Sequence, residues 1–203
     1  MDSFALQADG LRRGLRSEGL SWCAVSESAS QVVLFGSHAV GLSRENSDWD
    51  LLCVGHGHTR RSKRLDLVWV TPEHLRSDTW LGSELATHIA SYGRWLLGED
   101  NWSDRTYISD ESILRKRCAL ARQLDTVKRY WGHLTPGFRK KYEHRLRRNV
   151  QRLHYLLAGW PVPPTRLLDD EWSAIRDSML VLPSCLEEMH KEVSQVLCRL
   201  SVP

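Results

Sequence analysis

The sequence predicts an α+β fold in which a small domain containing β-strands is followed by an α-helical bundle. Three short apolar runs rich in β-branched residues lie within residues 31–70 and are bounded by Gly, Ser and Asp. Beyond residue 100 the pattern changes, because apolar residues recur with the period of an amphipathic helix in four successive segments. We therefore expect one domain at residues 1–100 and a second at residues 101–203.

The first domain is expected to open with a helix over residues 5–18, since Leu11 and Leu15 lie one helical turn apart. Three strands follow. They are predicted at residues 31–35, 48–54 and 64–70.

A further helix of this domain is predicted to begin at Ser83, with Glu84 in its first turn. Leu96 lies on its apolar stripe, and Gly98 is expected to end it.

Four helices are expected in the second half. Asp110 is a candidate cap for the first, whose apolar stripe ends at Trp131, and Pro136 begins the second, which Gly159 ends. A proline-rich connector at residues 161–164 precedes a shorter helix after Asp169. Ser184 and Glu187 then form a capping-box pattern at the start of the last helix.

Charge is distributed unevenly, although the net charge is only +3. Residues 115–152 contain thirteen Lys and Arg against two acids, whereas residues 169–192 contain seven acids against two bases. Two interpretations remain open at this point. The charges either form solvated helix faces that partly neutralise each other, or mark a surface that meets phosphates.

Bulk composition argues against a membrane or disulfide-stabilised protein. No apolar run reaches the 18 residues of a membrane-spanning helix, and the first residues lack the pattern of a signal peptide. The five cysteines are odd in number, scattered, and never spaced as Cys-x-x-Cys. We expect reduced thiols, a cytoplasmic location and no membrane partner, while the oligomeric state is not indicated.

Three aspartates and one turn carry the functional signal. Gly36 and Ser37 end the first apolar run, and Asp48 and Asp50 open the second. Alternate strand residues share a face, so these two carboxylates are expected to point the same way, with Cα atoms about 7 Å apart. Asp66 lies within the third apolar run, where a carboxylate is costly to bury unless it is paired or binds a metal.

This ordered pattern resembles the nucleotidyltransferase superfamily that includes DNA polymerase beta, and its spacing is similar to the minimal and the aminoglycoside nucleotidyltransferases. The resemblance covers roughly residues 31–70. It implies a small mixed β-sheet nucleotidyltransferase domain, here followed by the α-helical bundle. It also implies magnesium-dependent transfer of a nucleoside monophosphate from a nucleoside triphosphate.

The resemblance assigns roles to individual residues. Asp48, Asp50 and Asp66 would be catalytic and would hold two Mg²⁺ ions. Gly36, Ser37 and Lys63 would bind the triphosphate of the co-substrate, which we expect to be ATP. Glu84 is a candidate general base, although a first-turn acid also stabilises a helix on its own.

Minimal members of the superfamily usually carry arginine where this chain has His38 and Val40. Five other basic residues could replace those arginines, and the sequence does not show which does so. They are Arg44, Arg60, Arg61, Lys63 and Arg64.

The acceptor is left open by the sequence. A small antibiotic-like molecule or a protein hydroxyl is the preferred interpretation. RNA, such as a tRNA end, is the alternative, because aromatic residues interleave with the bases of residues 115–152 and Arg145, Arg147, Arg148 and Arg152 could contact phosphates. A catalytically silent nucleotide-binding module is disfavoured because all three aspartates are present.

Overall fold

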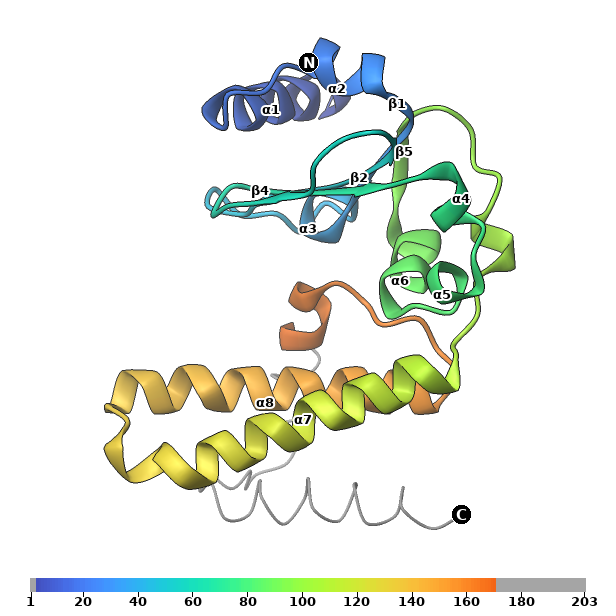
Figure 1. Cartoon of the computed structure of the whole chain (residues 1–203). Coiled ribbons are helices and arrows are strands. Elements are labelled where there is room, and N and C mark those ends of the chain that lie inside the picture. Colours follow the sequence, from blue (N-terminus) through green and yellow to red (C-terminus); the bar gives the residue numbers. More distant parts are fainter. Residues whose placement is uncertain (1–2, 171–203) are drawn as a thin grey trace. The chain divides into compact units, whose positions relative to one another are not determined.

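The computed structural model describes residues 3–170 of the chain, with side chains described from residue 8 onward. The chain forms two compact units that divide between Tyr107 and Ile108. The first contains the β-sheet, and the second begins with two long helices (Figure 1).

The first unit is built on a five-stranded sheet. Its strands are β1 Ala29–Phe35, β2 Trp49–Gly55, β3 Arg60–Arg61, β4 Leu65–Val70 and β5 Arg94–Leu97, in the order β3-β4-β2-β1-β5. β2 and β4 run parallel, whereas the other neighbouring pairs are antiparallel. The sheet is therefore mixed, and the predicted α+β class is confirmed.

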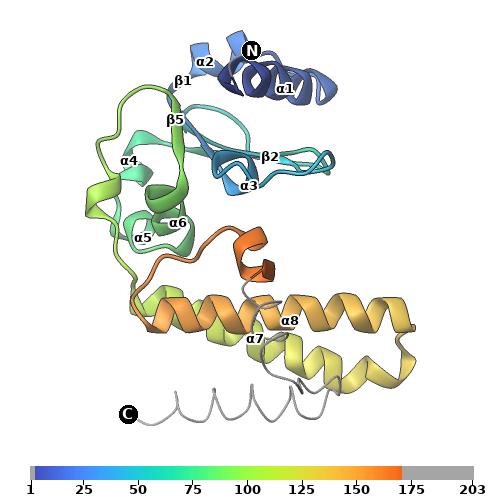
Figure 2. The same cartoon turned by 180° about the vertical axis from the view of Figure 1, so that it is seen from behind.

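Helices cover both faces of this sheet. α1 Ser3–Ser17 and α2 Trp22–Ser28 lie on one face, and α4 Pro72–Leu75, α5 Asp78–Leu81 and α6 Glu84–Tyr92 lie on the other (Figures 1 and 2). Because strand residues alternate between faces, the sheet contributes residues to two separate apolar clusters, one on each face. One contains Leu11 and Leu15 of α1 with Leu51 of β2, and the other contains Ile89 of α6 with Leu52.

Two short elements complete the first unit. α3 Gly36–Ala39 follows β1 directly, and a 3₁₀ turn, η1, spans Ser103–Arg105.

The predicted helix through residue 97 is wrong in its last turn. α6 ends at Tyr92, and Gly93 follows it with an extended backbone, where a Cβ would lie 2.5 Å from the carbonyl oxygen of Ile89. Residues 94–97 form β5, which pairs with β1. The apolar spacing of residues 85–96 fits a helix. However, pairing of β5 with β1 satisfies backbone N–H and C=O groups along an edge of β1 that would otherwise be free. The local residue pattern gives no sign of that edge.

The second unit begins with two long helices that pack against each other, α7 Asp110–Tyr130 and α8 Pro136–Leu157, with a 3₁₀ turn, η2 Trp131–His133, after α7. Their shared core contains Leu120, Leu124, Val127, Leu146 and Leu153, as the helical spacing predicts. Leu157, expected at the end of the second apolar stripe, is exposed instead. The cap of α7 is Ser109 rather than Asp110, since the Ser109 side chain accepts the N–H of Ser112.

The last predicted helices fall only partly within the described residues. Residues 165–170 are helical, so this helix begins before Asp169 and not after it. The other residues of the helix expected after Asp169, the helix expected from Ser184, and most of the acidic segment 169–192 lie outside the described residues.

The described cysteines are free thiols. Cys23 and Cys118 are exposed, whereas Cys53 is buried in β2, where desolvation raises the pKa of its thiol to about 12. Cys185 and Cys198 lie outside the described residues. Within residues 3–170, no helix combines the length and the apolar character needed to cross a lipid bilayer.

Candidate active site

Asp50 and Asp66 lie side by side on one face of the sheet. They are direct partners in the parallel pairing of β2 with β4, and neighbouring strands are about 5 Å apart. Both face away from α1, because the alternate residues Trp49 and Leu65 belong to the cluster that contains Leu11 and Leu15. The sheet thus brings together two aspartates that are sixteen positions apart in the sequence.

Asp48 lies just outside the strand. β2 begins at Trp49, one residue later than predicted, and Asp48 is exposed in the preceding loop. Its charge still reaches Asp50. Burial, followed by the negative charges of Asp48 and Asp66, raises the pKa of the Asp50 carboxyl to about 7, and the positive charge of Arg61 partly opposes this shift.

Asp66 is held through one of its two carboxylate oxygens. Arg61 Nε and Nη2 donate to Asp66 Oδ2 at 3.0 and 2.8 Å. Asp66 Oδ1 is buried and accepts no hydrogen bond from the described part of the chain. The carboxylate therefore presents an acceptor oxygen whose desolvation is not offset, and a bound cation would satisfy it.

The sequence does not single out Arg61 as a residue of the site. It is one of five basic residues that could replace the usual arginines, and the sequence does not predict the short strand β3 that carries it. The antiparallel pairing of β3 with β4 places Arg61 directly opposite Asp66. Its guanidinium is 78% exposed, and its pKa is raised by the hydrogen bond and charge of Asp66.

Gly36 brings the β1–α3 turn against the carboxylate of Asp50. Its φ is +68°, and a Cβ at this position would lie 2.0 Å from Asp50 Oδ2. Any side chain would therefore collide with the carboxylate as well as strain the backbone. Ser37 follows in the first turn of α3, so the predicted Gly-Ser turn and Asp50 lie together.

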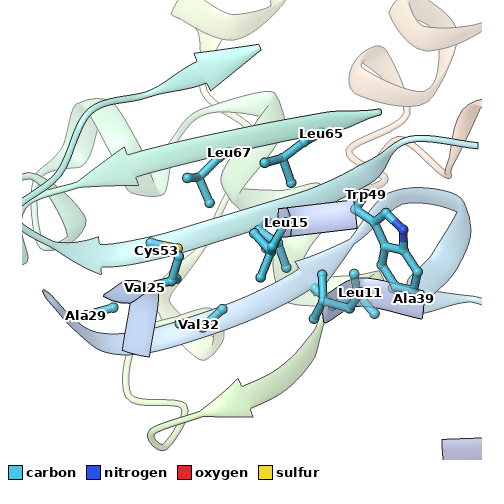
Figure 3. Packing of buried hydrophobic residues seen from close by; sticks show 12 residues of the cluster. Leu11, Leu15, Val25, Ala29, Val32, Ala39, Trp49, Cys53, Leu65 and Leu67 are labelled. Carbon is cyan, nitrogen blue, oxygen red and sulfur yellow. The ribbon is translucent and has the colours of Figure 1, made fainter. Parts of the chain in front are cut away.

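Trp49 points to the opposite face, as the alternation of the strand predicted. Its ring lies against α1, where the positions of a Cβ on Gly10 and on Gly14 would be only 2.9 and 2.7 Å from it. Figure 3 shows the indole beside Leu11 and Ala39. The ring of His38 stacks on the indole at 3.7 Å, and burial lowers the pKa of this imidazole.

Within the described part of the chain, Lys63 shares no hydrogen bond or ion pair with the three aspartates, and its role in binding the triphosphate stays a prediction. Lys63 is exposed in the turn between β3 and β4 and lines a cavity together with Arg44 and Arg64. Glu84 is half-buried at the first position of α6, behind the cap residue Ser83. Its role as a base stays a prediction.

The carboxylate oxygens of the site are suitable ligands for a divalent cation, although the carboxylates are not arranged around a common point. No group of three or more His, Cys, Asp or Glu side chains within residues 3–170 is arranged to hold a metal ion. However, burial and the repulsion by neighbouring carboxylates raise the pKa of Asp50, and Asp66 Oδ1 accepts no hydrogen bond from the described residues. Added positive charge would favour the ionised form of Asp50 and would satisfy Asp66 Oδ1. Oxygen donors are also the ligands that Mg²⁺ prefers.

Three of the four arginines expected to contact RNA are engaged within the second unit. Arg147 pairs with Glu143, and Arg148 donates to both carboxylate oxygens of Asp169 at 2.7 and 2.8 Å. Arg152 donates to the Thr165 hydroxyl at 2.9 Å.

The first unit contains a segment that matches a known protein family. Residues 23–96 match the nucleotidyltransferase domain family. The matched segment contains Gly36, Asp48, Asp50, Asp66 and Glu84, and extends from α2 into β5. This match confirms the resemblance to the nucleotidyltransferases. No curated protein matches the chain.

Seven chains of solved structures match as well. One comes from a structure titled "Crystal structure of the toxin-antitoxin with AMP-PNP" and is 17% identical, with 61% of this chain and 97% of that chain covered. Its TM-score is 0.29, which is too low to inform the site.

Proposed function

We propose that the protein transfers a nucleoside monophosphate from a nucleoside triphosphate, with ATP the expected co-substrate, to an acceptor hydroxyl. The observation that carries this proposal is the pairing of Asp50 with Asp66 beside the Gly36 turn, within a domain of the nucleotidyltransferase family. The first unit would perform the chemistry, and the second would be an appended helical domain.

Asp48, Asp50 and Asp66 would hold magnesium. When bound, two such ions would neutralise phosphate charge and activate the attacking hydroxyl. The protein contributes position: β2 and β4 fix Asp50 and Asp66 in register, and Asp48 adds an exposed carboxylate at the mouth of the site. Arg61 neutralises Asp66 in part, so it would limit how strongly the three acids repel the incoming triphosphate.

Gly36 and Ser37 would bind the triphosphate. The turn offers backbone N–H groups and the Ser37 hydroxyl next to the carboxylate of Asp50, so donors for phosphate and ligands for the cation lie side by side. Transfer of this kind needs little covalent chemistry from the protein, and positioning with charge neutralisation supplies the rate. Glu84 would act as general base from the start of α6, on the same face of the sheet as the aspartates.

A small molecule or a protein is the preferred acceptor. The internal pairing of Arg147, Arg148 and Arg152 supports this preference, because these three guanidinium groups already have partners within the second unit. The pair Arg148–Asp169 also supports the interpretation that acidic and basic segments neutralise each other.

An acceptor screen tests this assignment. The protein is incubated with Mg²⁺ and ATP labelled at the α-phosphate, in separate reactions with aminoglycosides, protein extract and total tRNA. We expect label on a small molecule or a protein. Label on tRNA alone would contradict the preferred acceptor but keep the reaction class, and label on none of the three would count against the function.

A further inference from the structure

A basic pocket lies at the end of the sheet where β2 begins. It has a volume of about 700 Å³ and is formed by α1, by His38 of α3, by the loop between α3 and β2, and by the turn between β3 and β4. This volume is within the usual range for a cavity that binds a small molecule. Trp49 and the backbone of Gly10 and Gly14 form its apolar part.

The charged residues around this pocket are mostly cations. Arg13, Arg44, Lys63 and Arg64 line it, whereas Glu45 is the only carboxylate among the described residues that do so. The loop that carries Arg44 is fixed locally, because the Arg44 N–H donates to Ser47 Oγ at 2.8 Å and the Ser47 N–H donates to the Arg44 carbonyl at 2.9 Å. Several arginines around one cavity suit a compact anion with several oxygens, because guanidinium groups bind phosphate through paired N–H donors.

The pocket adjoins the site of the aspartates but does not include them. His38, which lines it, follows Ser37 directly, and the charge of Asp48 acts on its imidazole. Trp49, which lines it, and Asp50, its neighbour, point to opposite faces of the sheet. Among the described lining residues there is no Asp48, Asp50 or Asp66. An anion in the pocket therefore meets cations, while the metal-free aspartate site repels it.

We propose that this basic pocket binds the phosphate groups of a second ligand, distinct from the nucleoside triphosphate at the Gly36 turn. Lys63 is then assigned to this pocket rather than to the triphosphate. Binding at this pocket does not depend on the transfer reaction, since none of the three aspartates lines it.

Calorimetric titration with inorganic tripolyphosphate tests the pocket. EDTA is present, so that the aspartates carry no metal and do not attract the probe. The variant Arg13→Glu removes one lining cation, and Arg16→Glu is its matched control, because Arg16 is exposed on the same helix but does not line the pocket. We expect at least a tenfold loss of affinity for Arg13→Glu and less than a threefold loss for Arg16→Glu. An equal loss in both variants would overturn the proposal, since only net charge would then matter.

A second titration, with MgATP, distinguishes the two phosphate sources. We expect Arg13→Glu and Arg16→Glu to bind MgATP with affinities within twofold of each other. A selective loss of MgATP affinity in Arg13→Glu would show that the pocket holds the triphosphate itself and would overturn the separate ligand. Absence of MgATP binding by the unmodified protein would count against the proposed function, whereas the tripolyphosphate result would still decide the pocket.

Discussion

The two faces of the sheet differ most at the start of β2, where the consecutive residues Trp49 and Asp50 face in opposite directions. Trp49 is 9% exposed and packs into α1, so this face is closed by apolar contacts. Asp50 faces the other way. Together with Asp66 and the exposed Asp48 it leaves negative charge that Arg61 only partly balances. The residues of β2 on one face therefore stabilise the fold, whereas Asp50 on the other face carries a charge that is not fully balanced. Such perturbed charges are typical of functional sites.

The largest effect is expected from neutralising the charged face. Asp50→Asn keeps the shape of the side chain but removes a cation ligand, so transfer should fall by at least about a hundredfold, which corresponds to roughly 2.7 kcal/mol of transition-state stabilisation. The measurement is the rate of label transfer from ATP. Asp104→Asn, which changes an exposed acid in η1, is the control. Retention of a tenth of the activity by Asp50→Asn would refute its role as a metal ligand.

The opposite face is expected to respond in stability. Trp49→Ala removes the ring that lies against Gly10 and Gly14 and on which His38 stacks, so the free energy of unfolding should fall by about 3–5 kcal/mol. Urea unfolding followed by circular dichroism measures this change. Trp160→Ala, at a tryptophan that is 59% exposed, should change it by less than about 1 kcal/mol. Equal effects of the two substitutions would show that Trp49 is not part of the core.

The charged face is also expected to make the stability of the protein depend on pH, through Asp50. Without metal, the folded protein keeps a proton on Asp50 up to a pKa of about 7, whereas the unfolded chain releases it near the ordinary value of 3.8. The folded state then binds more protons between these values, so the free energy of unfolding should fall as the pH rises through this window, by at most about 1.4 kcal/mol per pH unit.

Asp50→Asn should lack this contribution. Both proteins carry His38, whose lowered pKa gives a slope of opposite sign, so the difference between their unfolding curves in EDTA isolates Asp50. Parallel curves from pH 4 to pH 8 would mean that Asp50 is not perturbed.

The smallest effect is expected at Arg61. Its guanidinium is exposed, so Arg61→Gln should change the free energy of unfolding by less than about 1 kcal/mol. Because the substitution removes a cation that competes at Asp66, affinity for Mn²⁺ should rise about two- to fivefold in a calorimetric titration. Arg60→Gln is the neighbouring control, as Arg60 donates to the carbonyl of Glu18 instead. Weaker Mn²⁺ binding in Arg61→Gln alone would mean that Arg61 supports the cation site.

Sequence alone predicted those features of the site that depend on local order. The alternation of residues 48–50 predicted that Trp49 would face away from the aspartates, and the apolar run around Asp66 predicted its strand. By contrast, the role of Arg61 depends on the register of β3 against β4, and the strand β5 depends on the free edge of β1. The first depends on the register of a two-residue strand only five positions from Asp66, and the second on a contact between segments about sixty residues apart, and apolar spacing encodes neither. The basic pocket likewise joins three separate segments.

The most direct test of the central claim compares ATP labelled at the α-phosphate with ATP labelled at the γ-phosphate, in the presence of Mg²⁺ and the acceptor identified by the screen. Nucleotidyl transfer places the α-label on the acceptor and releases the γ-label in pyrophosphate. We predict this result for the unmodified protein and its loss in Asp50→Asn and Asp66→Asn. Transfer of the γ-label, or undiminished transfer of the α-label by both variants, would contradict the account.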